Sequence, residues 1–328
     1  MPHFRTTLKL PDFPFKISHT TSVLNIGSCF AEHIGNRLAQ YKFPSQLNPH
    51  GIVYNPISMA RVLDDLRSQK RYQKEDLFQY ADQWHSFAHH GYFSHPELAQ
   101  ALEKINKRLS QGQRFIPQLD VLILTFGTAN AFLWNQTGEI VANCHKMPGH
   151  EFKRIRLSVE EIVGSLQEQL SALRQIRPEL NVLLTVSPVR HIRDGLVENQ
   201  RSKATLLLAA ELLERELNFV HYFPSYELVI DDLRDYRFYD RDMIHPSSLA
   251  VDYVWEQFAA SFFSKETQAL MKRIHHIISA SQHRPFHAQS AAHQTFIKKQ
   301  IDEIAVLQKE FPTLDFSQEI AIFDNQRS

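Results

Sequence analysis

Ser28 stands between a short apolar stretch and a helical pattern, where a protein can present an oxygen nucleophile. Residues 22–26 are apolar and β-branched enough to predict a buried strand, and apolar side chains recur at helical spacing over residues 31–41. At such an elbow the hydroxyl lies beside the first amides of the helix, which can stabilise a negative charge. The simpler alternative is a helix N-cap, a common role that requires no chemistry.

A carboxylate and an imidazole occur three residues apart near the other end of the chain. Asp242 and His245 stand in Asp-Met-Ile-His-Pro, directly before a predicted helix. On a loop, such a pair can reach a serine together: the histidine takes the hydroxyl proton, and the carboxylate orients the ring. We therefore predict Ser28 as nucleophile, His245 as base and Asp242 as the orienting acid. Arg237 and Asp240 are near enough in sequence to support this loop.

These two motifs together carry a family resemblance. Gly-Ser after the first strand, combined with Asp-x-x-His-Pro before a late helix, resembles the SGNH hydrolases, relatives of the GDSL lipases and esterases. Residues 27–31 read Gly-Ser-Cys-Phe-Ala, which is similar to the GSCFA family, a branch resembling that superfamily. The resemblance extends over most of residues 20–260. It implies a three-layer fold of the SGNH or flavodoxin type and a serine esterase or acyl hydrolase.

The same resemblance indicates where an oxyanion hole would be built, with one departure. Gly51 is the best match to the second glycine block of the SGNH pattern, and the alternative is a simple turn glycine. The third block reads Gly-x-Asn-Asp in the SGNH pattern, but after Gly127 this chain has Ala129 where the asparagine belongs. Asn130, displaced by one position, and Asn143, in a second GSCFA-like segment, are the alternative donors.

Histidines and cysteines raise the question of a metal or of a second nucleophile. His145 and His191 are interpreted as pocket lining or as polar groups satisfied by backbone. The 18 histidines include no carboxylate-flanked pair of the zinc-hydrolase type, so we predict no metal and no cofactor. Cys29 is expected to be a buried small hydrophobe, because neighbouring side chains on an elbow point in different directions.

Strands alternating with helices predict a parallel α/β sheet flanked by helices, in which ligands bind at the carboxyl ends of the strands. About five strands are expected. The clearest strands are 22–26, 120–126, 181–188 and 219–222, and the clearest helices are 57–69, 95–110, 199–217 and 247–263. The domain boundaries expected are 1–263 for the catalytic domain and 264–328 for a helical C-terminal appendage.

Composition limits the remaining possibilities. Lys plus Arg and Asp plus Glu both number 36, so the net charge is zero and no basic field favours nucleic acid or an anionic membrane. The 2 cysteines form no disulfide framework, and no apolar leader or membrane-length run is visible, so a cytoplasmic location is expected.

The function predicted is hydrolysis of small O-acyl esters through an acyl-enzyme, with O-acetyl carbohydrate as one candidate substrate. The alternatives are an O-acyltransferase that uses the same triad, and a ligand-binding protein that retains the fold without turnover. The partner expected is a small-molecule or glycan ester, and the sequence leaves the oligomeric state open.

Overall fold

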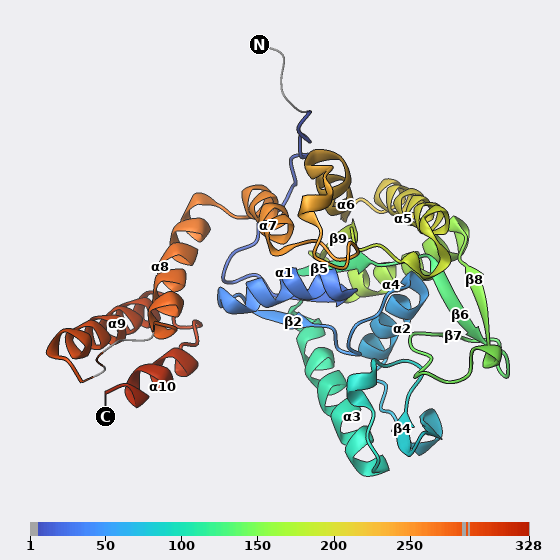
Figure 1. The fold of residues 1–328 in the computed structure, drawn as a ribbon, viewed down its shortest axis with the longest axis horizontal. Coiled ribbons are helices and arrows are strands. Elements are labelled where there is room, and N and C mark those ends of the chain that lie inside the picture. Colours follow the sequence, from blue (N-terminus) through green and yellow to red (C-terminus); the bar gives the residue numbers. More distant parts are fainter. Residues whose placement is uncertain (1–5, 284–286, 288, 328) are drawn as a thin grey trace.

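The computed structural model describes residues 6–283, 287 and 289–327, and is built on a five-stranded parallel sheet (Figure 1). Its strands are β1 (Val23–Gly27), β2 (Ser45–Leu47), β5 (Val121–Phe126), β9 (Asn181–Val186) and β10 (Val220–Tyr222). They lie in the order β10-β9-β5-β1-β2. The strand order reverses at β1, so the topological switch point, where ligands bind in open α/β sheets, lies between the carboxyl ends of β1 and β5. This is the predicted flavodoxin-like arrangement, and the fold class is confirmed.

Helices cover both faces of the sheet. One face packs against α2 (Pro56–Arg67), α3 (Leu98–Phe115), α4 (Val159–Ile176) and α5 (Leu196–Glu216); the other packs against α1 (Cys29–Gln40) and α7 (Ser248–Phe262). Successive strand side chains point to opposite faces. Thus Leu122 and Leu124 enter the first apolar cluster, whereas Val121 and Ile123 enter the second. Both layers therefore hold the carboxyl ends of the strands in place.

Two smaller sheets lie beside the main one. The first is an antiparallel hairpin of β3 (Phe78–Tyr80) and β4 (Gln83–His85). An antiparallel sheet in the order β7-β6-β8 was not expected; it consists of β6 (Asn130–Trp134), β7 (Ile140–Val141) and β8 (Phe152–Arg156). Its first strand begins directly after the Gly127 segment.

The C-terminal segment is helical, as predicted, and consists of α8 (Lys265–Ser281), α9 (Ala291–Glu310) and α10 (Ser317–Asn325). These helices project to one side of the sheet and share an apolar cluster of their own (Figure 1). Lys42 at the end of α1 bonds to Glu319 of α10, with 2.8 Å between Nζ and Oε1. Within the described residues, no helix is long and apolar enough to cross a membrane.

Candidate active site

Ser28 lies at the elbow between β1 and α1, at the carboxyl edge of the sheet. It is the N-cap of α1, and its Oγ accepts a hydrogen bond from Phe30 N at 3.3 Å. The side chain is 0% exposed. The elbow requires glycine at position 27, because a Cβ there would lie 2.4 Å from Thr125 O on β5. The close approach of β5 therefore fixes where the hydroxyl sits.

Asp242 and His245 form a direct pair on the loop before α7. Asp242 Oδ2 accepts a hydrogen bond from His245 Nδ1 at 2.6 Å. The other oxygen, Oδ1, accepts the backbone N–H groups of Ile244 and His245 at 2.8 and 3.0 Å. Bonding to His245, with help from these amides, lowers the pKa of Asp242 to about 2. The pair is therefore a fixed carboxylate holding an imidazole, although the two side chains are 45% and 48% exposed.

Backbone hydrogen bonds hold this loop. Asp240 N donates to His245 O at 2.7 Å, so Asp240 supports the loop through its main chain. Arg190 N donates to Ile244 O at 3.2 Å, and the Arg190 guanidinium lies 4.2 Å from the centre of the Tyr239 ring. Arg237, expected to support the loop, instead lies 3.8 Å from Asp235 on the surface. Arg190 supplies the support that Arg237 was expected to give.

The structure brings His245 close to α1 without bonding it to Ser28. Among the described residues no hydrogen bond joins His245 to Ser28, and His245 Nε2 has no hydrogen-bond partner. The pKa of His33 on α1 is lowered by burial, and the charges of Arg37 and His245 add to that effect. The pair thus leaves one ring nitrogen free, and the roles of all three residues stay predictions.

Gly51 lies in a tight turn below the elbow. Its φ is +76°, a conformation that favours glycine, and a Cβ would lie 2.4 Å from His90 Cβ. The Gly51 N–H donates to Asn48 O at 2.8 Å. The Gly51 N–H, which was predicted to stabilise an oxyanion, is therefore bonded within its own turn in this structure.

Gly127 lies beside the serine, and a Cβ at Gly127 would be 3.3 Å from Ser28 Cβ. Its N–H and that of Thr128 both donate to Tyr54 O, at 2.9 and 3.1 Å. Gly127 therefore shapes the space next to Ser28, while its amide is already bonded.

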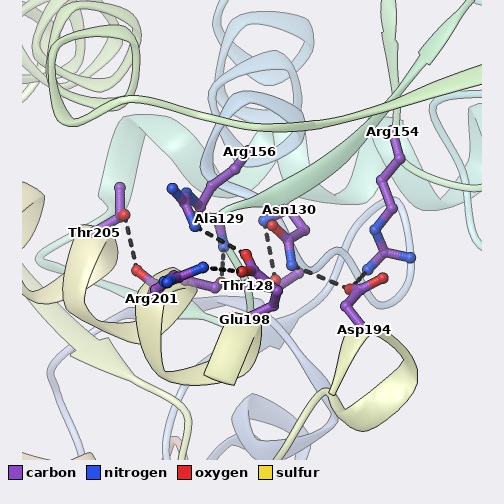
Figure 2. Close-up of polar contacts among 10 residues, drawn as sticks. Thr128, Ala129, Asn130, Arg154, Arg156, Asp194, Glu198, Arg201 and Thr205 are labelled. Carbon is purple, nitrogen blue, oxygen red and sulfur yellow. Dashed lines mark hydrogen bonds and ion pairs between the residues drawn. The ribbon is translucent and has the colours of Figure 1, made fainter. Parts of the chain in front are cut away.

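Asn130, at the start of β6, lies in a polar cluster with Asp194 and Arg154 (Figure 2). Its Nδ2 donates to Asp194 Oδ2 at 3.3 Å, and Asp194 also forms an ion pair with Arg154. The Asn130 N–H donates to Thr128 Oγ1 at 3.0 Å. The displaced asparagine thus holds the antiparallel sheet to the segment before α5.

Asn143 and His145 lie at a different cavity, of about 570 Å³, which His85 and His90 also line. Asn143 Oδ1 accepts His145 N at 2.9 Å, and His145 Nε2 donates to Ser86 O at 2.8 Å. Burial lowers the pKa of His145 to about 4. These contacts fit the expected role of His145 as a polar group satisfied by backbone.

His191 follows β9 and packs edge-on against Tyr54, with 5.6 Å between ring centres. Its Nε2 is buried without a partner in the described part of the chain. Burial, followed by the charges of Lys203, Arg154 and His245, lowers the pKa of His191 to about 3. The ring is therefore neutral, and the charge of His245 contributes to keeping it so.

Three polar residues of α5 that the sequence analysis missed hold the strand ends together. Asn199 Oδ1 accepts His191 N at 2.8 Å, and Ser202 Oγ bonds to Ala129 N at 2.8 Å and Thr128 Oγ1 at 2.9 Å. Lys203 Nζ donates to Gly127 O and Ser187 O, both at 2.6 Å. We name Asn199, Ser202 and Lys203 the α5 clamp.

A signal for the clamp exists in the sequence. Asn199 and Lys203 continue, at helical spacing, the buried stripe of Leu206, Ala210 and Leu213. Polar residues on the buried stripe of a helix require partners, because an unpaired buried polar group is costly.

The neighbouring thiol is a poorer nucleophile than its position suggests. Cys29 is half-buried, and burial followed by the charge of Glu32 raises its pKa, which keeps it protonated. Within the described ranges, no group of three His, Cys, Asp or Glu side chains could hold a metal ion.

A groove of about 640 Å³ opens beside Gly51. Glu32 lines its α1 side, and the exposed ring of Tyr92 lies at its rim. The α3 side carries Lys104, Lys107 and Arg108. The groove thus has charged side chains on both walls and an aromatic surface, next to the segment that follows β2.

Comparison with known proteins identifies the family. A similar solved structure is a carbohydrate esterase family 3 from Talaromyces cellulolyticus, with 12% identity, a TM-score of 0.34, and coverage of 77% of this chain and 98% of that chain. No curated protein matches the sequence significantly. The model of the GSCFA domain protein C-terminal domain matches residues 274–327, and the model of the GSCFA family matches residues 22–258. The resemblance seen in the motifs is therefore confirmed, and the chain belongs to the GSCFA family.

Proposed function

We propose that this protein is a serine ester hydrolase that uses Ser28, His245 and Asp242. The observation that carries the proposal is the Asp242–His245 contact of 2.6 Å, which orients the ring and leaves Nε2 free. Such a pair matters near Ser28 because a serine hydroxyl is a weak nucleophile until a base takes its proton. The protonated thiol of Cys29 supports the serine as the attacking group.

The reaction follows from these roles. Ser28 Oγ forms a bond to the acyl carbon while its proton passes to His245 Nε2, and Asp242 stabilises the imidazolium. The ring then gives this proton to the departing alkoxide, which leaves as the alcohol. Water, deprotonated by the same ring, then attacks the acyl-enzyme. As the bond between the acyl carbon and Ser28 Oγ breaks, the ring returns this proton to Oγ and the acid is released. Negative charge on the acyl oxygen is stabilised by the N-terminus of α1, where the helix dipole is positive.

The groove beside Gly51 supports a polar substrate such as an O-acylated carbohydrate. Its volume of about 640 Å³ lies within the ordinary range of small-molecule sites. Tyr92 is 73% exposed and offers a ring face on which a sugar can stack. A small acyl group on a carbohydrate hydroxyl fits this combination of aromatic and polar lining.

Acyl transfer is a second candidate, favoured by the complete burial of Ser28. A site that excludes water protects an acyl-enzyme from hydrolysis and leaves it for a sugar hydroxyl. A ligand-binding protein without turnover would need neither the free Nε2 nor the serine.

A fluorophosphonate probe tests these possibilities. We expect wild type and Cys29→Ala to be labelled at Ser28 and Ser28→Ala to stay unlabelled, since the probe reacts with activated serines. Labelling that disappears in Cys29→Ala instead would make the thiol the nucleophile, and unlabelled wild type would favour the binding protein. Adding sugar acceptors during turnover of an acetyl ester would then separate transfer from hydrolysis by the product formed.

A further inference from the structure

The segment that should complete the oxyanion hole has no free backbone N–H group. In residues 127–130 the N–H groups of Gly127 and Thr128 go to Tyr54 O, and that of Ala129 goes to Ser202 Oγ. Asn130 uses its N–H on Thr128 and its amide on Asp194. The asparagine of the SGNH pattern therefore has no replacement within this segment.

A positive charge lies directly beneath the same segment. Lys203 is 1% exposed, and its Nζ is 2.6 Å from both Gly127 O and Ser187 O. An ammonium has three N–H groups, so one N–H of Lys203 has no acceptor among the described residues. Gly127 in turn lies against Ser28, where a Cβ would be 3.3 Å from Ser28 Cβ. Gly127 thus separates the buried Lys203 ammonium from Ser28, and the low dielectric constant of the interior strengthens the field of this charge.

We propose that Lys203 is a positioning residue whose positive charge stabilises the oxyanion at Ser28, in place of the missing asparagine, so that its protonation state controls turnover. The proposal rests on the ester-hydrolase function above. Lys203 acts through the Gly127 peptide, which it orients, and through its field, which opposes the negative charge of the tetrahedral intermediate. In the protonated form of Lys203 the charge is present before the reaction begins, so no reorganisation is needed when the oxyanion forms.

The pKa of Lys203 is separated from those of the titratable groups near it. Burial lowers the pKa of Lys203 to about 7, against an opposing contribution from Cys29. Cys29 on α1 and Tyr54 after β2 both have pKa values raised by burial, so they titrate at higher pH. His191 after β9 has a pKa of about 3 and stays neutral. The charge of Glu32 on α1 adds to the raised pKa values of both Cys29 and Tyr54.

The test is kcat/KM for p-nitrophenyl acetate between pH 6.5 and 9, in wild type, Lys203→Arg, Lys203→Met and Ser202→Ala. Wild type should fall by about 10- to 100-fold as pH rises through the lysine titration, the order expected for one electrostatic donor. Lys203→Arg keeps its charge and should lose this alkaline fall. Lys203→Met should show the low activity at every pH. Ser202→Ala breaks the neighbouring arm of the α5 clamp without changing charge, and should keep the wild-type pH profile.

Melting temperatures and fluorophosphonate labelling of the same proteins separate the possible failures. If Lys203→Met does not fold, the comparison of Lys203→Arg with Ser202→Ala decides the matter alone. An alkaline fall that persists in Lys203→Arg, or profiles that Ser202→Ala and Lys203→Arg share, would overturn the role of Lys203 while Ser28 labelling upholds the hydrolase. Wild type that neither labels at Ser28 nor hydrolyses esters would overturn the proposed function, and this inference with it.

Discussion

The serine and the Asp–His pair of the proposed triad lie in opposite surroundings. Ser28 is 0% exposed, between a glycine that β5 approaches closely and an α5 clamp that ties down the neighbouring strand ends. His245 is 48% exposed, on a loop held by main-chain hydrogen bonds and containing Met243 at a φ of +58°. The fold thus positions the nucleophile, whereas a short local motif positions the base. Substitutions in the two regions should therefore differ in whether they affect stability or rate.

The largest effect expected is on turnover, from either side of the site. Ser28→Ala or His245→Ala should lower ester hydrolysis by about 10⁴-fold or more, because triad members act as a unit, and the double variant should be little worse. Stability should separate the regions. Ser28→Ala removes a helix cap and should cost about 1 kcal/mol in the free energy of unfolding, whereas the exposed His245→Ala should cost less.

Denaturant unfolding and p-nitrophenyl ester hydrolysis on the same preparations measure both quantities. Leu249→Ala, an exposed change beside the loop, serves as a control and should leave both unchanged. Hydrolysis at the wild-type rate in Ser28→Ala would mean that Ser28 is only a cap.

Asp242→Asn should produce a smaller loss of rate with the fold intact. The amide keeps the size of the side chain but favours the wrong imidazole tautomer, which costs roughly 10²- to 10⁴-fold in kcat. The backbone bonds to Ile244 and His245 can still form with the amide oxygen, so the melting temperature should change little. A variant that unfolded instead would show that the carboxylate serves the loop rather than the chemistry.

Lowering the pH should reduce the free energy of unfolding mainly through the buried region, and the exposed loop with Asp242 and His245 should contribute little. His50 is 0% exposed, and burial lowers its pKa to about 3. Its unfolded pKa is about 6.5, so between these values the unfolded state binds one more proton. The contribution of His50 to stability is complete above pH 6.5 and is lost by about 1.4 kcal/mol per pH unit as pH falls towards 3.

Urea unfolding at pH 7, 6 and 5 measures this slope. His50→Gln should flatten the slope by one proton, because the glutamine does not titrate. His150→Gln, at a side chain 80% exposed, should leave the slope as in wild type. Equal slopes in all three proteins would show that His50 is not buried as a neutral ring.

The sequence predicted the parts of this molecule whose signals are local. Continuous apolar residues predict buried strands such as 120–126, and the Gly-Ser and Asp-x-x-His-Pro motifs are short and specific. The parallel sheet and the Asp242–His245 contact followed from them. The β7-β6-β8 sheet was missed because its strands are short and half-exposed, so they show neither a continuous apolar run nor a clear alternation.

The α5 clamp was missed for a different physical reason. Its residues are neighbours in one helix, but their partners lie at the ends of β5 and β9, more than one element away. Periodicity showed that the face is buried, and only the strand order could show what that face meets. For the same reason the sequence could place Asn130 near the site but could not direct its amide, which Asp194 takes.

The smallest effect expected is on substrate preference, at the groove beside Gly51. Lys104, Lys107 and Arg108 line its α3 side against one acid, Glu32, in a chain whose net charge is zero. No ion pair of Lys104 or Lys107 occurs among the described residues, although Lys104 lies 5.9 Å from the Tyr92 ring centre. Unpaired cations beside an aromatic face favour a carbohydrate ester that carries a carboxylate over a neutral one.

Replacing both lysines by glutamine should therefore lower kcat/KM for an acetylated methyl glucuronide by about 3- to 10-fold, since each exposed pair is worth at most about 1 kcal/mol. The acetylated methyl glucoside should change by less than twofold, and added salt should erase the difference between the two substrates by screening. The double variant Lys265→Gln, Lys272→Gln on α8 provides the matched control with the same change of charge outside the groove lining. If the double variant lost activity equally on both sugars, the lysines would shape the groove without reading charge. If the double variant lost no activity on either sugar, the substrate would bind outside this groove and approach Ser28 from the exposed loop that carries His245.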